Sequence, residues 1–238
     1  MNLNSNKKIF VTVLGVLALA LHLGMSLWGT DEKGLLITAH PLAIALLAVT
    51  ALACLYAAMG LWGRKVSDAY ADNFIPSAAA AIGCFAMAGG IAVTVISGSG
   101  AWLRLEQIRN LFGILAVPLL VVLGLKRFSG KRPFFLLHGL VCVYLTLHTI
   151  SHYQIWSSTP QWLHWLFPMA ASVLLTLFAY RQTAFDVDMG SHRKQVVTGL
   201  LAVFFCIGAI LTENSMLYLG GAVWTLTNLC APEKEIRQ

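Results

Sequence analysis

Three polar residues, Glu106, Arg109 and Asn110, stand at the head of an otherwise apolar segment, LEQIRNLFGILAVPLLVVLGL. On a helix, residues three and four positions apart are neighbours, so these side chains share one face. An arginine in such a group can hold an anion or a carboxylate. The same spacing also fits a helix end that is tied by an ion pair at a membrane boundary. The sequence leaves both interpretations open.

A second group of residues able to do chemistry lies in VYLTLHTISHYQIW. Tyr144, His148 and His152 are spaced by four residues, which places them on one face of a helix. Two histidines four apart can chelate a metal ion, and His164 or Glu213 could complete such a site. The same side chains could instead line a solute site or make polar contacts between helices. All three interpretations stay open.

A haem site would need two axial histidines on facing helices, and His22 or His40 opposite His148 could supply them. Nothing in the spacing demands that arrangement. The chain has five cysteines, and no two of them form a C-x-x-C pair or a zinc pattern. We therefore expect no metal and no cofactor.

The composition predicts that lipid surrounds the elements that carry these residues. Of 238 residues, 58% are hydrophobic and 11% are charged, whereas soluble domains carry about 25% charged residues. A water-soluble fold of this size could not hide so much apolar surface. The net charge of +6 could suggest nucleic acid, but the basic residues are distributed as expected for contact with an anionic inner leaflet.

Eight segments are apolar enough to be candidate membrane helices, each of which needs about 20 mainly apolar residues. They cover residues 8–29, 36–62, 75–97, 103–125, 134–155, 161–181, 195–212 and 214–230. The last two are short, and the LTENSM between them predicts a tight hairpin. No long soluble insertion separates the segments, so residues 1–238 are predicted to form a single all-α transmembrane domain.

The third segment is rich in small residues at helical spacing. Ala79 and Gly83, and again Ala86 and Gly90, are four residues apart. Such pairs let the backbones of two membrane helices approach closely. We therefore expect this helix to sit in the middle of the bundle.

The basic residues predict the orientation of the chain, because loops on the cytoplasmic side carry an excess of Lys and Arg. With both termini inside, 13 of the 16 basic residues fall on the inner side. These are Lys7, Lys8, Arg64, Lys65, Lys126, Arg127, Lys131, Arg132, Arg181, Arg193, Lys194, Lys234 and Arg237. The opposite topology would invert the ratio, so the sequence predicts N-in and C-in.

This orientation places the charged helix end in the outer leaflet. The purely apolar part, Leu111 to Leu125, has 15 residues and spans about 22 Å, whereas the hydrocarbon core is about 30 Å thick. The helix must therefore extend to about residue 105, which draws the polar residues into the membrane. At the inner side, Asp186 and Asp188 lack the ligand count of a calcium loop, so we expect them to be solvated turn residues.

The second half of the chain resembles an uncharacterised family of multi-spanning membrane proteins from clostridial bacteria. The resemblance rests on PFFLLHGLVCVYLTLHTISHYQIWSSTPQ, AYRQTAFDVDMGSHRK and YLGGAVWTLTNLC, and covers roughly residues 130–231. It implies a membrane location and a multi-spanning topology. It implies no activity, and no functional residue follows from it.

Together these features predict a multi-pass protein of a bacterial cytoplasmic membrane that handles a small solute or ion. Glu106, Arg109, Asn110, His148 and His152 would line an outward-facing polar pocket, with Arg109 as the charge anchor and the histidines as polar or proton-exchanging walls. The alternatives are a metal- or haem-binding redox subunit and a scaffold for another membrane protein. A membrane enzyme, with Glu106 and a nearby histidine as its reactive pair, is the least favoured.

Overall fold

The computed structural model describes residues 3–30, 40–59, 74–97, 104–129, 133–156, 162–187 and 189–229. The described elements are eight α-helices: α1 (Leu3–Trp28), α2 (Pro41–Met59), α3 (Phe74–Ser97), α4 (Arg104–Phe128), α5 (Phe135–Trp156), α6 (Trp162–Asp186), α7 (His192–Gly208) and α8 (Ser215–Leu229). The all-α prediction is confirmed. The helices α3 to α6 begin within one residue of their predicted starts, because long apolar runs define them.

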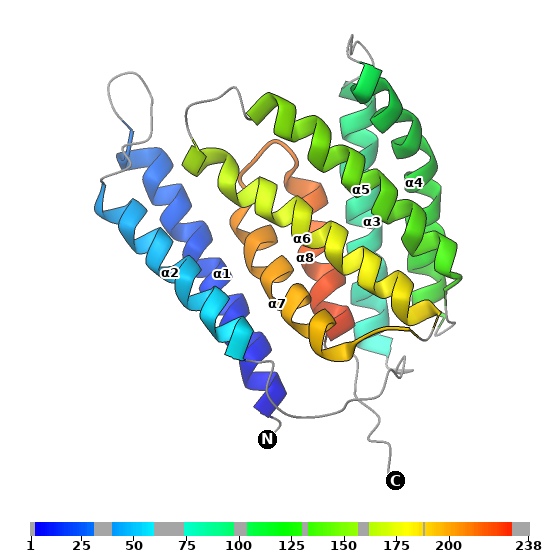
Figure 1. Ribbon diagram of the computed structural model, residues 1–238, viewed down its shortest axis with the longest axis horizontal. Coiled ribbons are helices and arrows are strands. Elements are labelled where there is room, and N and C mark those ends of the chain that lie inside the picture. Colours follow the sequence, from blue (N-terminus) through cyan, green and yellow to red (C-terminus); the bar gives the residue numbers. More distant parts are fainter. Residues whose placement is uncertain are drawn as a thin grey trace.

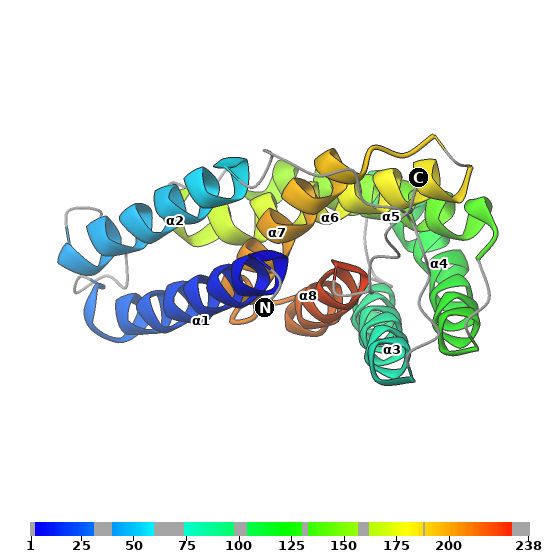
Figure 2. The ribbon, with the colours of Figure 1, turned by 90° about the horizontal axis from the view of Figure 1, so that it is seen from below.

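Six of the helices close into a ring in which each packs against the next: α3, α4, α5, α6, α7, α8 and again α3. Figure 2 shows this ring as two layers, with α5, α6 and α7 on one side and α3, α4 and α8 on the other. The α1–α2 pair packs on the outside of α7. Side chains that point between the two layers are therefore enclosed by helices from both.

Consecutive helices run in opposite directions, so α1 begins on the same side of the bundle on which α2, α4 and α6 end (Figure 1). Most of the described basic residues near helix ends gather on this side, whereas Arg104, the first residue of α4, lies at the opposite end. Those on this side include Lys8 in α1, Lys126 and Arg127 in α4, Arg181 in α6, and Lys194 in α7. We call this side the basic end of the bundle. The helices α1, α5 and α7 end at the opposite end.

The closest helix contact, between α3 and α8, depends on glycines. A Cβ added at Gly90 would lie 2.5 Å from the backbone nitrogen of Leu217, and one at Gly220 would lie 2.4 Å from that of Met87. A Cβ at Gly83 would lie 2.6 Å from the backbone nitrogen of Trp224. The predicted close approach of a neighbour at Gly83 and Gly90 is therefore confirmed, and α3 lies between α8 and α4.

The outer surface of the described helices is apolar, as expected for contact with lipid. Large hydrophobic side chains point outward along their length, among them Ile9, Val13, Leu27, Ile44, Leu55, Ile82, Ile96, Leu111, Ile114 and Leu125. A soluble monomer rarely exposes contiguous apolar surface on this scale. Five of the described helices, α1 to α5, contain stretches that are long and apolar enough to cross a membrane. The chain is thus a helical, multi-pass membrane protein.

Candidate functional site

Arg109 lies in the second turn of α4, and only 5% of its surface is exposed. Its Nη1 donates a hydrogen bond to Oγ of Ser151 on α5 at 2.8 Å. Its Nε and Nη2 donate to Oδ1 of the adjacent Asn110 at 3.2 and 3.1 Å. These acceptors are neutral, and they use three of the five N–H groups of a guanidinium. Arg109 is therefore a buried cation with hydrogen-bonding capacity to spare.

Glu106 does not neutralise this charge. It is half-buried on α4, and among the described residues no ion pair joins it to Arg109. The guanidinium bonds across to α5 instead. Of the five residues predicted to line one site, Arg109 and Asn110 are joined by hydrogen bonds and His148 and His152 by a ring contact, whereas no described side-chain contact joins Glu106 to the other four.

The predicted face of α5 points into the bundle. His148 is fully buried and His152 is 6% exposed. Their ring centroids are 4.2 Å apart, and the ring of Tyr144 stacks on His148 at 5.9 Å. Both ring nitrogens of His148 and the hydroxyl of Tyr144 are buried with no hydrogen-bond partner among the described residues. Buried polar atoms normally have partners, so unpartnered ones in one row are unusual.

Arg109 and this row of α5 side chains form one cluster. Ser151, which accepts the hydrogen bond from Arg109, directly precedes His152 on α5 and lies three residues from His148. Gly113, one turn along α4 from Arg109, makes the approach possible. A Cβ there would lie 3.2 Å from Cε2 of Tyr144. The two polar segments found in the sequence therefore meet between α4 and α5.

The turn between α7 and α8 borders the same cluster. Asn214 places its side-chain amide 3.5 Å from Nε2 of His152. Its Oδ1 accepts a hydrogen bond from the hydroxyl of Thr94 on α3 at 3.1 Å. Ser151, Asn214 and Thr94 were not predicted as site residues. Asn214 lies in the LTENSM hairpin, whose polar residues were the available signal.

A haem site would need His22 or His40 to lie opposite His148. No described contact joins either of these residues to His148. His22 on α1 has its Nδ1 3.3 Å from the carbonyl oxygen of Gly208 and stacks on Phe167 at 5.7 Å. His40 accepts a hydrogen bond from the backbone N–H of Leu42 at the start of α2. The metal and haem interpretations therefore gain no support from these two residues.

The described part of the chain contains no group of three or more His, Cys, Asp or Glu side chains arranged to hold a metal ion. Glu213, which was considered as a further ligand, is exposed in the turn after α7. The side chain of His164 lies outside the described residues.

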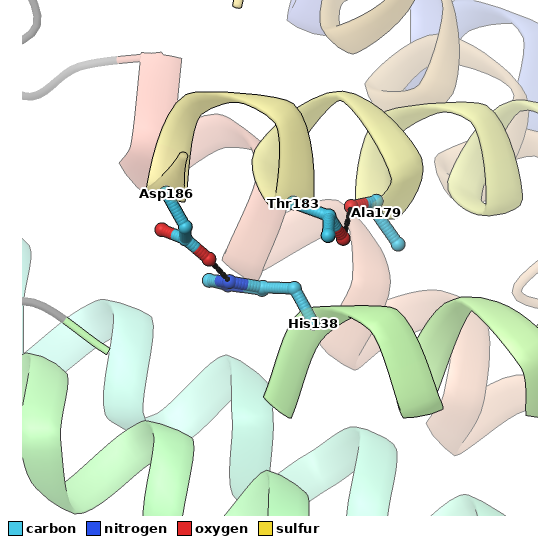
Figure 3. A network of polar contacts seen from close by, with 4 residues as sticks. All are labelled: His138, Ala179, Thr183 and Asp186. Carbon is cyan, nitrogen blue, oxygen red and sulfur yellow. Dashed lines mark hydrogen bonds and ion pairs between the residues drawn. The ribbon is translucent and has the colours of Figure 1, made fainter. Parts of the chain in front are cut away.

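A second polar contact lies at the basic end of the bundle, between α5 and α6. Nδ1 of His138 and Oδ2 of Asp186 are 2.5 Å apart, and the two side chains are 4% and 0% exposed. Figure 3 shows the imidazole and the carboxylate pointing toward each other across the helix interface. The expectation that Asp186 is a solvated turn residue is wrong, because α6 continues to residue 186 and carries the carboxylate into the interface. Asp188 lies outside the described residues.

The fold and these contacts define the chain as a helical membrane protein with a buried cationic cluster. No protein-family model, curated protein or solved structure matches it. The resemblance of its second half to a clostridial membrane family stays a prediction.

Proposed function

We propose that this protein binds a small anionic solute between α4 and α5, as part of moving that solute across a bacterial cytoplasmic membrane. Arg109 is the charge anchor, and Asn110 and Ser151 orient its guanidinium. His148 and His152 form a wall of the site and offer ring nitrogens to the solute. Glu106 is not assigned a contact with the solute.

The observation that carries the proposal is the burial of Arg109 with only neutral hydrogen-bond partners. An arginine in a membrane helix costs up to about 3 kcal/mol on insertion scales, the value at the helix centre. A carboxylate in the bundle would offset that cost, but the described residues place none on the guanidinium. A bound anion would offset it, and a planar guanidinium suits carboxylates and other oxyanions because it donates two parallel N–H bonds.

The unpartnered atoms on α5 support the same site. A histidine ring and a tyrosine hydroxyl that are buried without partners would each normally cost about 1–3 kcal/mol. An oxyanion has several acceptor atoms, so it could bond Arg109 and one of these groups together. The hydroxyl of Tyr144 and an N–H of His148 are donors on the appropriate face.

We further propose that all eight helices lie in the membrane, with both termini inside and the Arg109 cluster toward the outer side. The alternating helix directions and the gathering of described basic residues at one end support this topology, because cytoplasmic ends carry more Lys and Arg. The helices α7 and α8, with 17 and 15 residues, are short for spans. Both helices nevertheless belong to the closed ring of α3 to α8, which supports placing them in the membrane with the other helices.

The proposal is tested by anion-dependent stability of the purified protein in detergent. Nitrate, methanesulfonate, phosphate and succinate are each compared with chloride at equal ionic strength. We expect at least one of them to raise the unfolding temperature, since a ligand at 100 times its Kd stabilises the folded state by about 2.7 kcal/mol. The increase should vanish in Arg109→Gln.

The matched control for this experiment is Lys126→Gln, which removes one positive charge from the other end of α4. It should leave the anion response unchanged. If none of the four anions stabilises the wild-type protein more than chloride does, or if Arg109→Gln responds like the wild type, Arg109 does not anchor an anion.

A further inference from the structure

Next to the proposed anion site, α5 carries buried polar atoms that no described residue bonds. The hydroxyl of Tyr144 and both ring nitrogens of His148 have no hydrogen-bond partner among the described residues, and both side chains are fully buried. The two rings stack on each other, so these atoms belong to one unit, which we call the α5 row. Buried polar atoms normally have partners. The α5 row therefore offers a binding place for a polar group of matching chemistry.

The α5 row lies deeper in the bundle than the guanidinium of Arg109. Ser151, which accepts the hydrogen bond from Arg109, is seven residues from Tyr144 on α5, or about 10 Å along the axis. His148 lies between them. On α4, Gly113 is one turn from Arg109 in the same direction, and a Cβ there would lie 3.2 Å from Cε2 of Tyr144, the ring carbon next to the one that bears the hydroxyl. A solute that reaches both Arg109 and the α5 row must therefore have two separate polar groups.

The charge at the site suits a single carboxylate. Two described arginines are buried, and Arg127 lies at the basic end, so Arg109 supplies the buried cation here. Its hydrogen bonds to Asn110 and Ser151 leave one N–H on each of its two terminal nitrogens. Through two such N–H groups a guanidinium bonds both oxygens of a carboxylate. Because both oxygens are then held at Arg109, a carboxylate alone leaves the α5 row without partners.

The α5 row itself suits a neutral group that both accepts and donates hydrogen bonds. A second positive charge in the same apolar cluster as Arg109 is costly, which favours the neutral form of His148. A neutral imidazole has one N–H donor and one acceptor nitrogen, and a tyrosine hydroxyl can donate. A carbonyl or ether oxygen could only accept. A hydroxyl group can accept from Tyr144 and donate to the acceptor nitrogen of His148.

Hydrocarbon side chains border the α5 row. A Cβ at Gly113 would lie 2.5 Å from Cγ2 of Val95 and 3.4 Å from that of Ile91, both on α3. Three helices, α3, α4 and α5, therefore meet closely at the depth of the Tyr144 ring. A second charged group at this depth would face apolar side chains, and a long solute would have to separate the helices. These surroundings favour a short solute that is uncharged beyond its carboxylate.

We propose that the solute held at Arg109 is a short monocarboxylate that carries a hydroxyl group. This inference rests on the proposed function. The carboxylate bonds the two remaining N–H groups of Arg109, and the hydroxyl, further along the carbon chain, bonds Tyr144 and His148. These two side chains thereby distinguish the solute from carboxylates of the same charge and length. A site built to bond a hydroxyl rejects the analogue that lacks it, because its own buried polar atoms then stay unpartnered.

Binding of four-carbon acids to the purified full-length protein in detergent tests this inference. Butyrate is compared by isothermal titration calorimetry with the three straight-chain hydroxybutyrates, which carry the hydroxyl on the second, third or fourth carbon. All have the same charge and carbon chain, so only the presence and the place of the hydroxyl differ. We expect at least one hydroxybutyrate to bind about tenfold or more tightly than butyrate.

Tyr144→Phe removes the hydroxyl and keeps the ring. We expect this variant to lose the preference for a hydroxybutyrate and to keep the wild-type affinity for butyrate. Removal of an unpartnered hydroxyl should not destabilise the unliganded protein. His148→Phe should also lose the preference, and if it does not fold, Tyr144→Phe alone decides.

Tyr218→Phe is the matched control. Tyr218 is an equally buried tyrosine on α8, but its hydroxyl already donates to the carbonyl oxygen of Pro168 at 3.1 Å. The preference for a hydroxybutyrate should therefore be the same in this variant as in the wild type.

The outcomes separate the two proposals. If butyrate binds as tightly as every hydroxybutyrate, or if the preference survives in Tyr144→Phe or His148→Phe, the α5 row does not bond a solute hydroxyl, and the anion site stands. The same conclusion follows if none of these carboxylates binds while nitrate, methanesulfonate, phosphate or succinate stabilises the protein. If no anion of either set binds, the proposed function fails and this inference fails with it.

Discussion

Replacing Gly90 with alanine is expected to destabilise the protein strongly, whereas the same change at the adjacent Gly89 is not. The new methyl group at Gly90 would lie 2.5 Å from the backbone nitrogen of Leu217 and 2.9 Å from its Cα. These are backbone atoms of α8, so no side-chain rotation relieves the clash and the two helices must separate. Overpacking typically costs about 1–3 kcal/mol. Because the clash is with a backbone, we expect the destabilisation by Gly90→Ala to lie at or above the upper value.

Gly89 is the matched control because a Cβ there meets no atom within 4 Å. Alanine at this position should be neutral or should stabilise the helix by up to about 1 kcal/mol, the difference in helix propensity. The measurement is the unfolding temperature of the three proteins in detergent, followed by size-exclusion chromatography after heating. We expect Gly90→Ala to unfold roughly 5–10 °C below wild type. Equal unfolding temperatures for the two variants would contradict the α3–α8 packing.

The second large effect is expected at the pair formed by His138 and Asp186. His138→Leu alone would remove the imidazole that contacts the buried carboxylate, and breaking a buried pair in this way costs about 3–5 kcal/mol. The double variant His138→Leu/Asp186→Leu removes both polar groups and should recover most of that loss, since apolar replacements of buried pairs are often neutral.

A double-mutant cycle on unfolding free energies measures this coupling. We expect an interaction energy of about 2 kcal/mol or more between the two positions, near the upper part of the range for residues in contact. Simple additivity of the two single changes would show that the pair does not hold α5 and α6 together. The cycle concerns stability alone.

The helices were largely predictable because a segment that crosses lipid must be both apolar and helical. Each segment of about 20 apolar residues must form a helix that satisfies its own backbone hydrogen bonds. The small residues at Gly83 and Gly90 likewise predicted a close helix contact. The end of α6 was not predictable in this way. It runs five residues beyond the predicted end at residue 181, and the partner of Asp186 lies 48 positions earlier, at His138.

The candidate site was predicted only in part. As with Asp186, the contacts that were missed join residues on different helices. Spacing alone placed His148 and His152 on one face of α5. It also suggested a local pairing of Glu106 with Arg109, but the guanidinium bonds to Ser151, 42 residues further along the chain. Local periodicity shows which residues share a helix face. It does not show which other helix that face meets.

The sequence-based prediction therefore missed site residues whose hydrogen-bond partners lie on another helix. Thr94 and Asn214 are 120 residues apart and are joined by a hydrogen bond at the edge of the cluster. Neither residue lies in a recognisable motif. The closed ring of α3 to α8, which brings them together, follows from packing between helices that the sequence pattern does not specify.

Charge-selective labelling at position 151 tests the central claim, an electropositive site around Arg109 that is reached from the outer side. Ser151 is replaced by cysteine in a protein whose five native cysteines are changed to alanine. Whole cells are then treated with membrane-impermeant methanethiosulfonates, one carrying a sulfonate and one a trimethylammonium. Each rate is divided by the rate of the same reagent with a free thiol in solution.

We expect the anionic reagent to be favoured by at least about tenfold, because the hydrogen bond from Arg109 to Ser151 places a positive charge within a few ångströms of the new thiol. The preference should fall to about one when Arg109→Gln is added. A preference for the cationic reagent, an anionic preference that survives Arg109→Gln, or reaction only when the reagents are admitted to the cytoplasmic side would contradict the account.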